Sequence, residues 1–98
     1  MKSLNTLRDE CFKNAEEHGW HDKDRTFGDV ISLAHSELSE AIEEFRKGRK
    51  VTETYYENLK PCGVPSELAD VIIRILDFCG KESIDIEKAV TDKMGYNK

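Results

Sequence analysis

The sequence of 98 residues lacks the features by which several common protein classes are recognised. No apolar run approaches the length of a membrane span, and the N-terminal residues MKSLNTLRDE have no apolar stretch typical of a signal peptide. An excess of positive charge is also lacking, because the formal net charge is −5. That balance gives no reason to expect binding to a nucleic acid polymer. These absences favour a cytoplasmic protein that acts on neither membranes nor nucleic acid polymers.

Cysteines are few, and their number and spacing exclude two further classes. Cys11, Cys62 and Cys79 are an odd set without the spacing of zinc ligands, which argues against both a disulfide framework and a zinc site. Cys11 and Cys79 fall on apolar stripes, so we expect buried thiols there. Unpaired thiols are typical of a reducing compartment, which agrees with a cytoplasmic location.

Alternation between apolar and polar residues is missing too, whereas apolar residues recur at helical spacing throughout the chain. We therefore expect an all-α fold, a bundle of about four main helices in a single domain over residues 1–98. Ser3 and Thr26 are the expected N-caps of the first two helices. Glycines end the helical patterns, and residues 52–59 could make a short helix within the uncertain region 49–63. The predicted helices cover residues 3–18, 27–47, 65–79 and 83–94, with stops at Gly19, Gly48, Gly80 and Gly95.

The third predicted helix is apolar nearly all round, which is typical of a helix buried on most sides. Hydrophobic content is only 38%, and a chain of this length buries a small fraction of its surface on its own. We therefore expect homo-oligomerisation, as a homodimer or homotetramer, to complete the core.

Two pairs of acidic residues at i, i+3 spacing lie on the second and third predicted helices. The pairs are Glu37 with Glu40 and Glu67 with Asp70, and a step of three residues places both members on one face of a helix. Four carboxylates brought together inside a bundle would repel one another unless a hard cation lay among them. The sequence therefore predicts that these acids converge and bind Mg²⁺, for which Mn²⁺ is a plausible substitute.

A structural explanation exists for some of these acids. Acidic residues commonly solvate the exposed face of a Glu-rich helix, and Glu67 near a helix start would complement the helix dipole. Asp70 has a weaker explanation of this kind, because Asp is a poor helix former away from the cap. Glu43 and Glu44 fit an exposed face better, although Glu44 lies one turn beyond Glu40 and could reach the cluster.

In these motifs the chain resembles the MazG-like, all-α nucleoside triphosphate pyrophosphohydrolases. The pattern of that family is two adjacent Glu, a third Glu three residues beyond the second, and a distal Glu-x-x-Asp on another helix. Glu37 and Glu40 match the second and third acids, and Glu67 and Asp70 match the distal pair. Ser36 stands at the position of the first acid, a departure that leaves one fewer possible ligand.

The resemblance implies hydrolysis of nucleoside triphosphates, deoxynucleoside triphosphates in particular, to the monophosphate and pyrophosphate. Such an activity would serve in nucleotide-pool house-cleaning. Mg²⁺ would neutralise charge that develops on the phosphates, and a carboxylate that is not fully engaged would accept a proton from the attacking water. Glu37 and Glu40 are both candidates for that catalytic role, and the sequence does not choose between them.

Four further residues are candidates for substrate binding. Members of the family tend to carry Lys-x-x-x-Asn near the end of the domain, and Lys93 with Asn97 fits that spacing. The resemblance implies that Lys93 contacts phosphate and that Asn97 bonds to phosphate or sugar. Tyr96 is beside Asn97, and Trp20 could either stack on a nucleobase or act as a hydrophobic staple for the first helix.

Two other classes of protein compete with this interpretation. A carboxylate-bridged di-iron protein needs Glu-x-x-His pairs, and no Glu in this chain is followed by His three residues later. A non-enzymatic helical interaction or regulatory module needs no convergence of the acids. It predicts that Mg²⁺ leaves the stability of the protein unchanged, whereas the enzyme predicts stabilisation by Mg²⁺ with a nucleotide.

Overall fold

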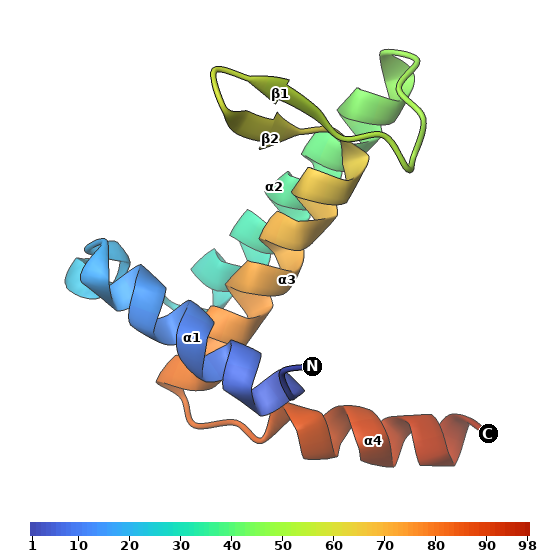
Figure 1. The fold of residues 1–98 in the computed structure, drawn as a ribbon. Coiled ribbons are helices and arrows are strands. Elements are labelled where there is room, and N and C mark those ends of the chain that lie inside the picture. Colours follow the sequence, from blue (N-terminus) through green and yellow to red (C-terminus); the bar gives the residue numbers. More distant parts are fainter. The chain divides into compact units, whose positions relative to one another are not determined.

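A computed structural model describes all 98 residues, and the chain is mostly helical (Figure 1). The all-α prediction is confirmed, apart from one two-stranded hairpin. No helix has both the length and the apolar character needed to cross a membrane. The elements are α1 (Leu4–Glu17), the 3-10 turn η1 (Trp20–Asp22), α2 (Phe27–Arg46), β1 (Tyr55–Glu57), β2 (Lys60–Cys62), α3 (Val64–Lys81) and α4 (Ile86–Asn97).

The chain divides into two compact units. The first consists of residues 1–24 and 75–98, which hold α1, η1, α4 and the last part of α3. The second consists of residues 25–74, which hold α2, the hairpin and the first part of α3. Each unit is described by itself below.

The N-caps predicted for the first two helices are confirmed. The Ser3 side chain accepts a hydrogen bond from the backbone N–H of Thr6, at 3.1 Å. Thr26 and Asp29 form a reciprocal capping box, in which each side chain accepts from the backbone N–H of the other residue. These local bonds satisfy N–H groups that have no partner inside the helix, and they fix where α1 and α2 begin.

The predicted stops at Gly80 and Gly95 are wrong, because both glycines lie inside helices. A Cβ added at Gly80 would lie 2.6 Å from Cβ of Phe12, so this glycine permits close packing of α1 on the end of α3. The start of α4 is also later than predicted. Ser83 lies in the preceding turn with φ +55°, and the N-cap is Asp85, which accepts from the backbone N–H of Lys88.

The short helix predicted over residues 52–59 is wrong, because this region holds the antiparallel hairpin β1–β2. Its turn residues are Asn58 and Leu59, with φ of +49° and +70°. Two consecutive positive values characterise the tight turn that matches the twist of a hairpin. Gly63 follows β2 with φ +113°, and a Cβ there would lie 2.4 Å from the carbonyl oxygen of Glu53, so only glycine fits.

A network of polar contacts links the hairpin to α2. The Tyr55 hydroxyl donates to the Glu44 carboxylate, at 2.9 and 2.8 Å from its two oxygens. The Arg49 guanidinium lies 3.8 Å from the centre of the Tyr55 ring and 2.9 Å from Glu53. Hydrogen bonding to Glu44 raises the pKa of Tyr55 to about 12. Glu44 is buried, so the expectation that it faces solvent is wrong, whereas Glu43 is exposed as predicted.

In the first unit, polar bonds join α1 to α4 and η1 to α3. Asn5 donates to the N-cap Asp85 at 2.9 Å, and the Arg8 guanidinium donates to the Ile84 carbonyl at 2.8 Å. His21 of η1 lies 2.7 Å from Asp77 of α3. The buried apolar residues of this unit are Leu76 and Cys79, which confirms Cys79 as a buried thiol, whereas Cys11 is half-buried.

Candidate metal site

Three carboxylates from two helices meet in the second unit. Glu37 of α2 and Glu67 and Asp70 of α3 each offer one oxygen, and these oxygens all lie within 4.8 Å of one another. All three residues are half-buried. The i, i+3 step on α3 directs Glu67 and Asp70 to one face, and the face of α2 that carries Glu37 packs against it. We call these three residues the acidic cluster.

Glu40, the fourth predicted acid, lies beside the acidic cluster and is more exposed than its members. Its carboxylate is close enough to those of Glu37 and Glu67 to raise the pKa of both groups. Carboxylates this close repel one another when they are ionised, and a bound proton or cation would relieve that repulsion. The structure therefore brings all four predicted acids into one neighbourhood.

Burial and mutual repulsion make the ionised cluster costly. Burial raises the pKa of Glu67 to about 7, and the nearby Glu40 carboxylate adds to the effect. Burial also raises the pKa of Glu37, with smaller contributions from Glu40 and Asp70. An acid whose pKa lies near neutrality binds a proton readily, and a divalent cation at the same place would relieve the same repulsion.

Arg74 lies next to the acidic cluster and was missed as a site residue by sequence reasoning. Its guanidinium is 3.4 Å from the Glu37 carboxylate, and this positive charge opposes the rise in the pKa of Glu37. The sequence contains a signal for the position of Arg74. Arg74 is four residues beyond Asp70 and seven beyond Glu67, so it lies on the same face of α3 as both acids. One fixed positive charge therefore balances part of the cluster.

The residues present fit a hard divalent cation. Oxygen Oε2 of Glu67 is buried and has no hydrogen-bond partner among the protein atoms. A buried carboxylate oxygen without a partner is costly, and a cation coordinated there would satisfy it. Carboxylate oxygens from Glu37, Glu67 and Asp70 are the donor type that Mg²⁺ and Mn²⁺ prefer.

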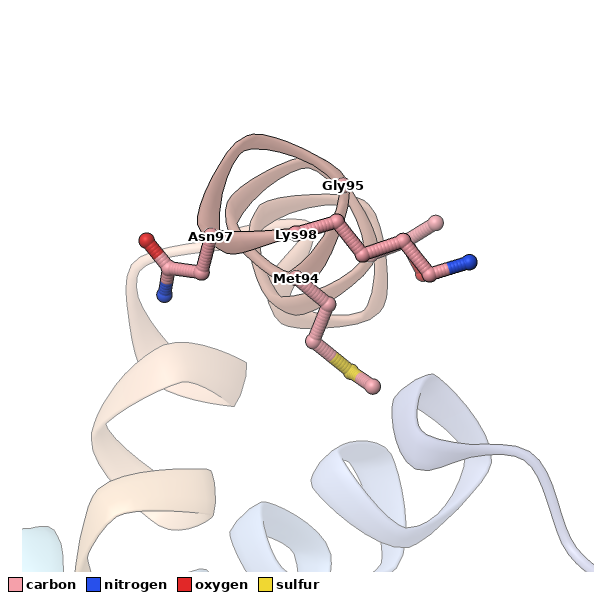
Figure 2. Close-up of a pocket in the computed structure, with 5 residues that line it drawn as sticks. Met94, Gly95, Asn97 and Lys98 are labelled. Carbon is pink, nitrogen blue, oxygen red and sulfur yellow. The ribbon is translucent and has the colours of Figure 1, made fainter.

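The predicted substrate-binding residues belong to the first unit, whereas the acids belong to the second. Lys93, Tyr96 and Asn97 lie near the end of α4, with the Lys93 ammonium 5.3 Å from the centre of the Tyr96 ring. Figure 2 shows that Asn97 and Lys98 project to opposite sides of α4, and Asn97 lines an open pocket there. Trp20 is half-buried in η1.

Comparisons with known proteins identify no relative of this chain. No family model, no curated protein and no solved structure matches it. The observations that bear on function are therefore the acid motifs of the sequence and the geometry of the acidic cluster.

Proposed function

We propose that this chain is a Mg²⁺-dependent nucleoside triphosphate pyrophosphohydrolase. The observation that carries the proposal is the meeting of three half-buried carboxylates from two helices, one with a buried oxygen that lacks a partner. The order and spacing of the acids resemble those of the MazG-like family, and this resemblance supports the substrate class. Release of pyrophosphate from nucleoside triphosphates, deoxynucleoside triphosphates in particular, is the proposed reaction, with nucleotide-pool house-cleaning as its role.

The acids divide into two proposed roles. Glu37, Glu67 and Asp70 hold the metal, and their half-buried position keeps the coordinating oxygens fixed. Mg²⁺, when bound, would neutralise charge on the triphosphate and make water more acidic. Glu40 is exposed at the edge of the cluster, whereas the Glu37 carboxylate is beside Arg74. Glu40 is therefore the better candidate for the base that accepts a proton from the attacking water.

Further parts of the proposal concern the substrate and the assembly. Lys93 would contact phosphate, Asn97 phosphate or sugar, and Tyr96 and Trp20 the remainder of the nucleotide. The enzyme would act in the cytoplasm as a homodimer or homotetramer. The exposed position of Lys93, Tyr96 and Asn97 supports their role in substrate binding, because nothing in the first unit covers these side chains.

The proposal is tested by measuring pyrophosphate release from each common ribo- and deoxynucleoside triphosphate, with and without Mg²⁺. Turnover that depends on Mg²⁺ is expected for at least one substrate. Glu40→Gln keeps the size of the side chain and should lower turnover at least about a hundredfold. Glu43→Gln is the matched control, because Glu43 is exposed and pairs only with its neighbour Arg46.

Two results would contradict the proposal. Absence of pyrophosphate release from every substrate would favour the non-enzymatic interaction or regulatory module. Equal turnover in Glu40→Gln and Glu43→Gln would remove Glu40 from the reaction.

A further inference from the structure

A positively charged side chain lies against the acidic cluster, and the roles proposed for the acids make no use of it. The Arg74 guanidinium is 3.4 Å from the Glu37 carboxylate. Only 27% of the Arg74 side chain and 15% of the Glu37 side chain are exposed. Charges so far from bulk water are screened less than surface charges, so the guanidinium acts on any cation that binds beside it.

The two sides of the acidic cluster differ in their partners. Burial is the largest influence on the pKa of Glu37 and raises it, whereas the Arg74 guanidinium lowers it. On the other side, the buried oxygen Oε2 of Glu67 has no hydrogen-bond partner among the protein atoms. A cation relieves the largest cost where a buried carboxylate oxygen lacks a partner. The best place for an ion is therefore beside Glu67, because Glu37 already has a positive partner.

The ligand oxygens of the acidic cluster suit one ion. One oxygen each from Glu37, Glu67 and Asp70 lie within 4.8 Å of one another. Mg²⁺ takes about six oxygens at roughly 2.1 Å, so the oxygens around one ion lie roughly 3–4 Å apart. Small movements of the side chains would bring the three oxygens onto one ion. The rest of its coordination shell would stay open to water or phosphate.

A second ion would meet the guanidinium. Paired metal ions in proteins lie about 3.5–4 Å apart, so a second ion would have to use the same group of carboxylates. An ion that shared the Glu37 carboxylate would lie close to the fixed positive charge of Arg74, which is unfavourable in a half-buried site. The four predicted acids bring four negative charges and Arg74 one positive charge. One divalent ion leaves this group with one negative charge, whereas two ions would make it positive.

We propose that Arg74 supplies, as a fixed charge, the positive charge that a second divalent ion would otherwise bring, so that the acidic cluster holds a single ion. Arginine suits this role because its guanidinium stays charged at every physiological pH. Its planar fork of N–H donors also matches the oxygens of a phosphate group. This inference rests on the proposed metal site and adds the number of its ions and a role for Arg74.

The number of ions is measured by titrating Mn²⁺ alone into the whole chain and following the electron paramagnetic resonance signal of the free ion. The wild-type protein should bind one Mn²⁺ per chain, and Mg²⁺ should displace it. Arg74→Met removes the charge but keeps an unbranched side chain. It should bind the first ion at least about threefold more tightly and should admit a second ion. Two ions in one cluster couple magnetically, which distinguishes this second ion from one bound elsewhere.

Two further variants separate the charge of Arg74 from other effects. Arg74→Lys keeps the positive charge and should bind one ion. Arg46→Met is the matched control, because it also removes one positive charge but from an exposed side chain of α2 that pairs with Glu43 at 2.9 Å. It should bind one ion with the affinity of the wild-type protein. Circular dichroism shows whether Arg74→Met is folded, and Arg74→Gln, with the same expected result, replaces it if it is not.

Each contrary result has its own meaning. Two ions in the wild-type cluster would overturn the inference and leave the metal site intact. No ion in the wild-type protein would contradict the metal site itself, and the inference with it. One ion, bound equally by the wild-type protein, Arg74→Met and Arg74→Gln, would mean that the guanidinium does not exclude a second ion, and would overturn the inference alone.

Discussion

Glu67 has a pKa of about 7, so its carboxyl group binds a proton over a pH range in which an ordinary glutamate is ionised. In the unfolded chain the pKa returns to its usual value near 4.5. Between these two values the folded state holds more protons than the unfolded state, and stability therefore falls as pH rises. The stabilisation is complete below pH 4.5 and is lost as pH rises through about 7.

The free energy of unfolding of the metal-free protein should therefore decrease between mildly acidic and mildly alkaline pH. Glu67→Gln should flatten this dependence and raise stability at alkaline pH, because the amide keeps the size of the side chain without its charge. Urea unfolding across a pH series, in the presence of a chelator, measures the effect. Glu43→Gln is the control and should keep the wild-type slope, since Glu43 is exposed and pairs with Arg46. An unchanged slope in Glu67→Gln would contradict the assigned environment of Glu67.

At the residue scale, the sequence predicts contacts between residues on one helix face well. It predicts contacts between segments that only the fold brings together less well. The i, i+3 steps placed Glu67 and Asp70 together, and the same geometry would have added Arg74. Glu44 was assigned to solvent because it stands in a run of acids. Its actual partner, Tyr55, comes from a hairpin whose path no helical periodicity can reveal.

At the element scale the turn of the hairpin holds local strain. Leu59 adopts φ +70°, where a side chain with a Cβ crowds the following carbonyl, and Asn58 adopts φ +49°. Asparagine tolerates this region far better than leucine. The usual sequence for such a turn is Asn-Gly, so Leu59 occupies the position where glycine is preferred.

Leu59→Gly should therefore stabilise the protein by about 1 kcal/mol, because relief of strain outweighs the extra freedom of glycine in the unfolded chain. Urea unfolding measures the change, and a gain is also expected in the melting temperature. Asn58→Gly is the comparison and should change stability less. A loss of stability in Leu59→Gly would mean that Leu59 makes a contact that outweighs the strain of its backbone.

The starts of α1 and α2 were predicted correctly, whereas the helix stops at Gly80 and Gly95 were not. Ser3 and Thr26 act through bonds to residues three positions away, so the sequence alone contains the whole motif. Glycine is ambiguous, because it either ends a helix or lets another segment approach closely. Gly80 does the latter, against Phe12, a residue far away in the sequence. The hairpin was missed because strands of three residues are too short to display alternation.

At the scale of the whole molecule, α2 presents two surfaces of different chemical character. Glu37 belongs to the acidic cluster, and the next residue, Leu38, lines an apolar groove between α2 and α3, about 100° around the helix. The apolar content of the sequence led us to expect that a second copy packs on the third helix, and this expectation stays a prediction. Only the structure shows that Leu38, Ile42 and Phe45 of α2 are exposed. Periodicity identifies an apolar face but does not tell which segment covers it.

The most direct test of the proposed metal site is a calorimetric titration of Mg²⁺ into the metal-free protein, without nucleotide. Saturable binding is predicted, and Asp70→Asn should weaken it at least about tenfold, because the substitution removes a charged ligand while keeping the shape of the side chain. Glu43→Gln should bind Mg²⁺ like the wild-type protein. Absence of binding in the wild-type protein, or equal binding in Asp70→Asn and wild type, would contradict a metal site at Glu37, Glu67 and Asp70.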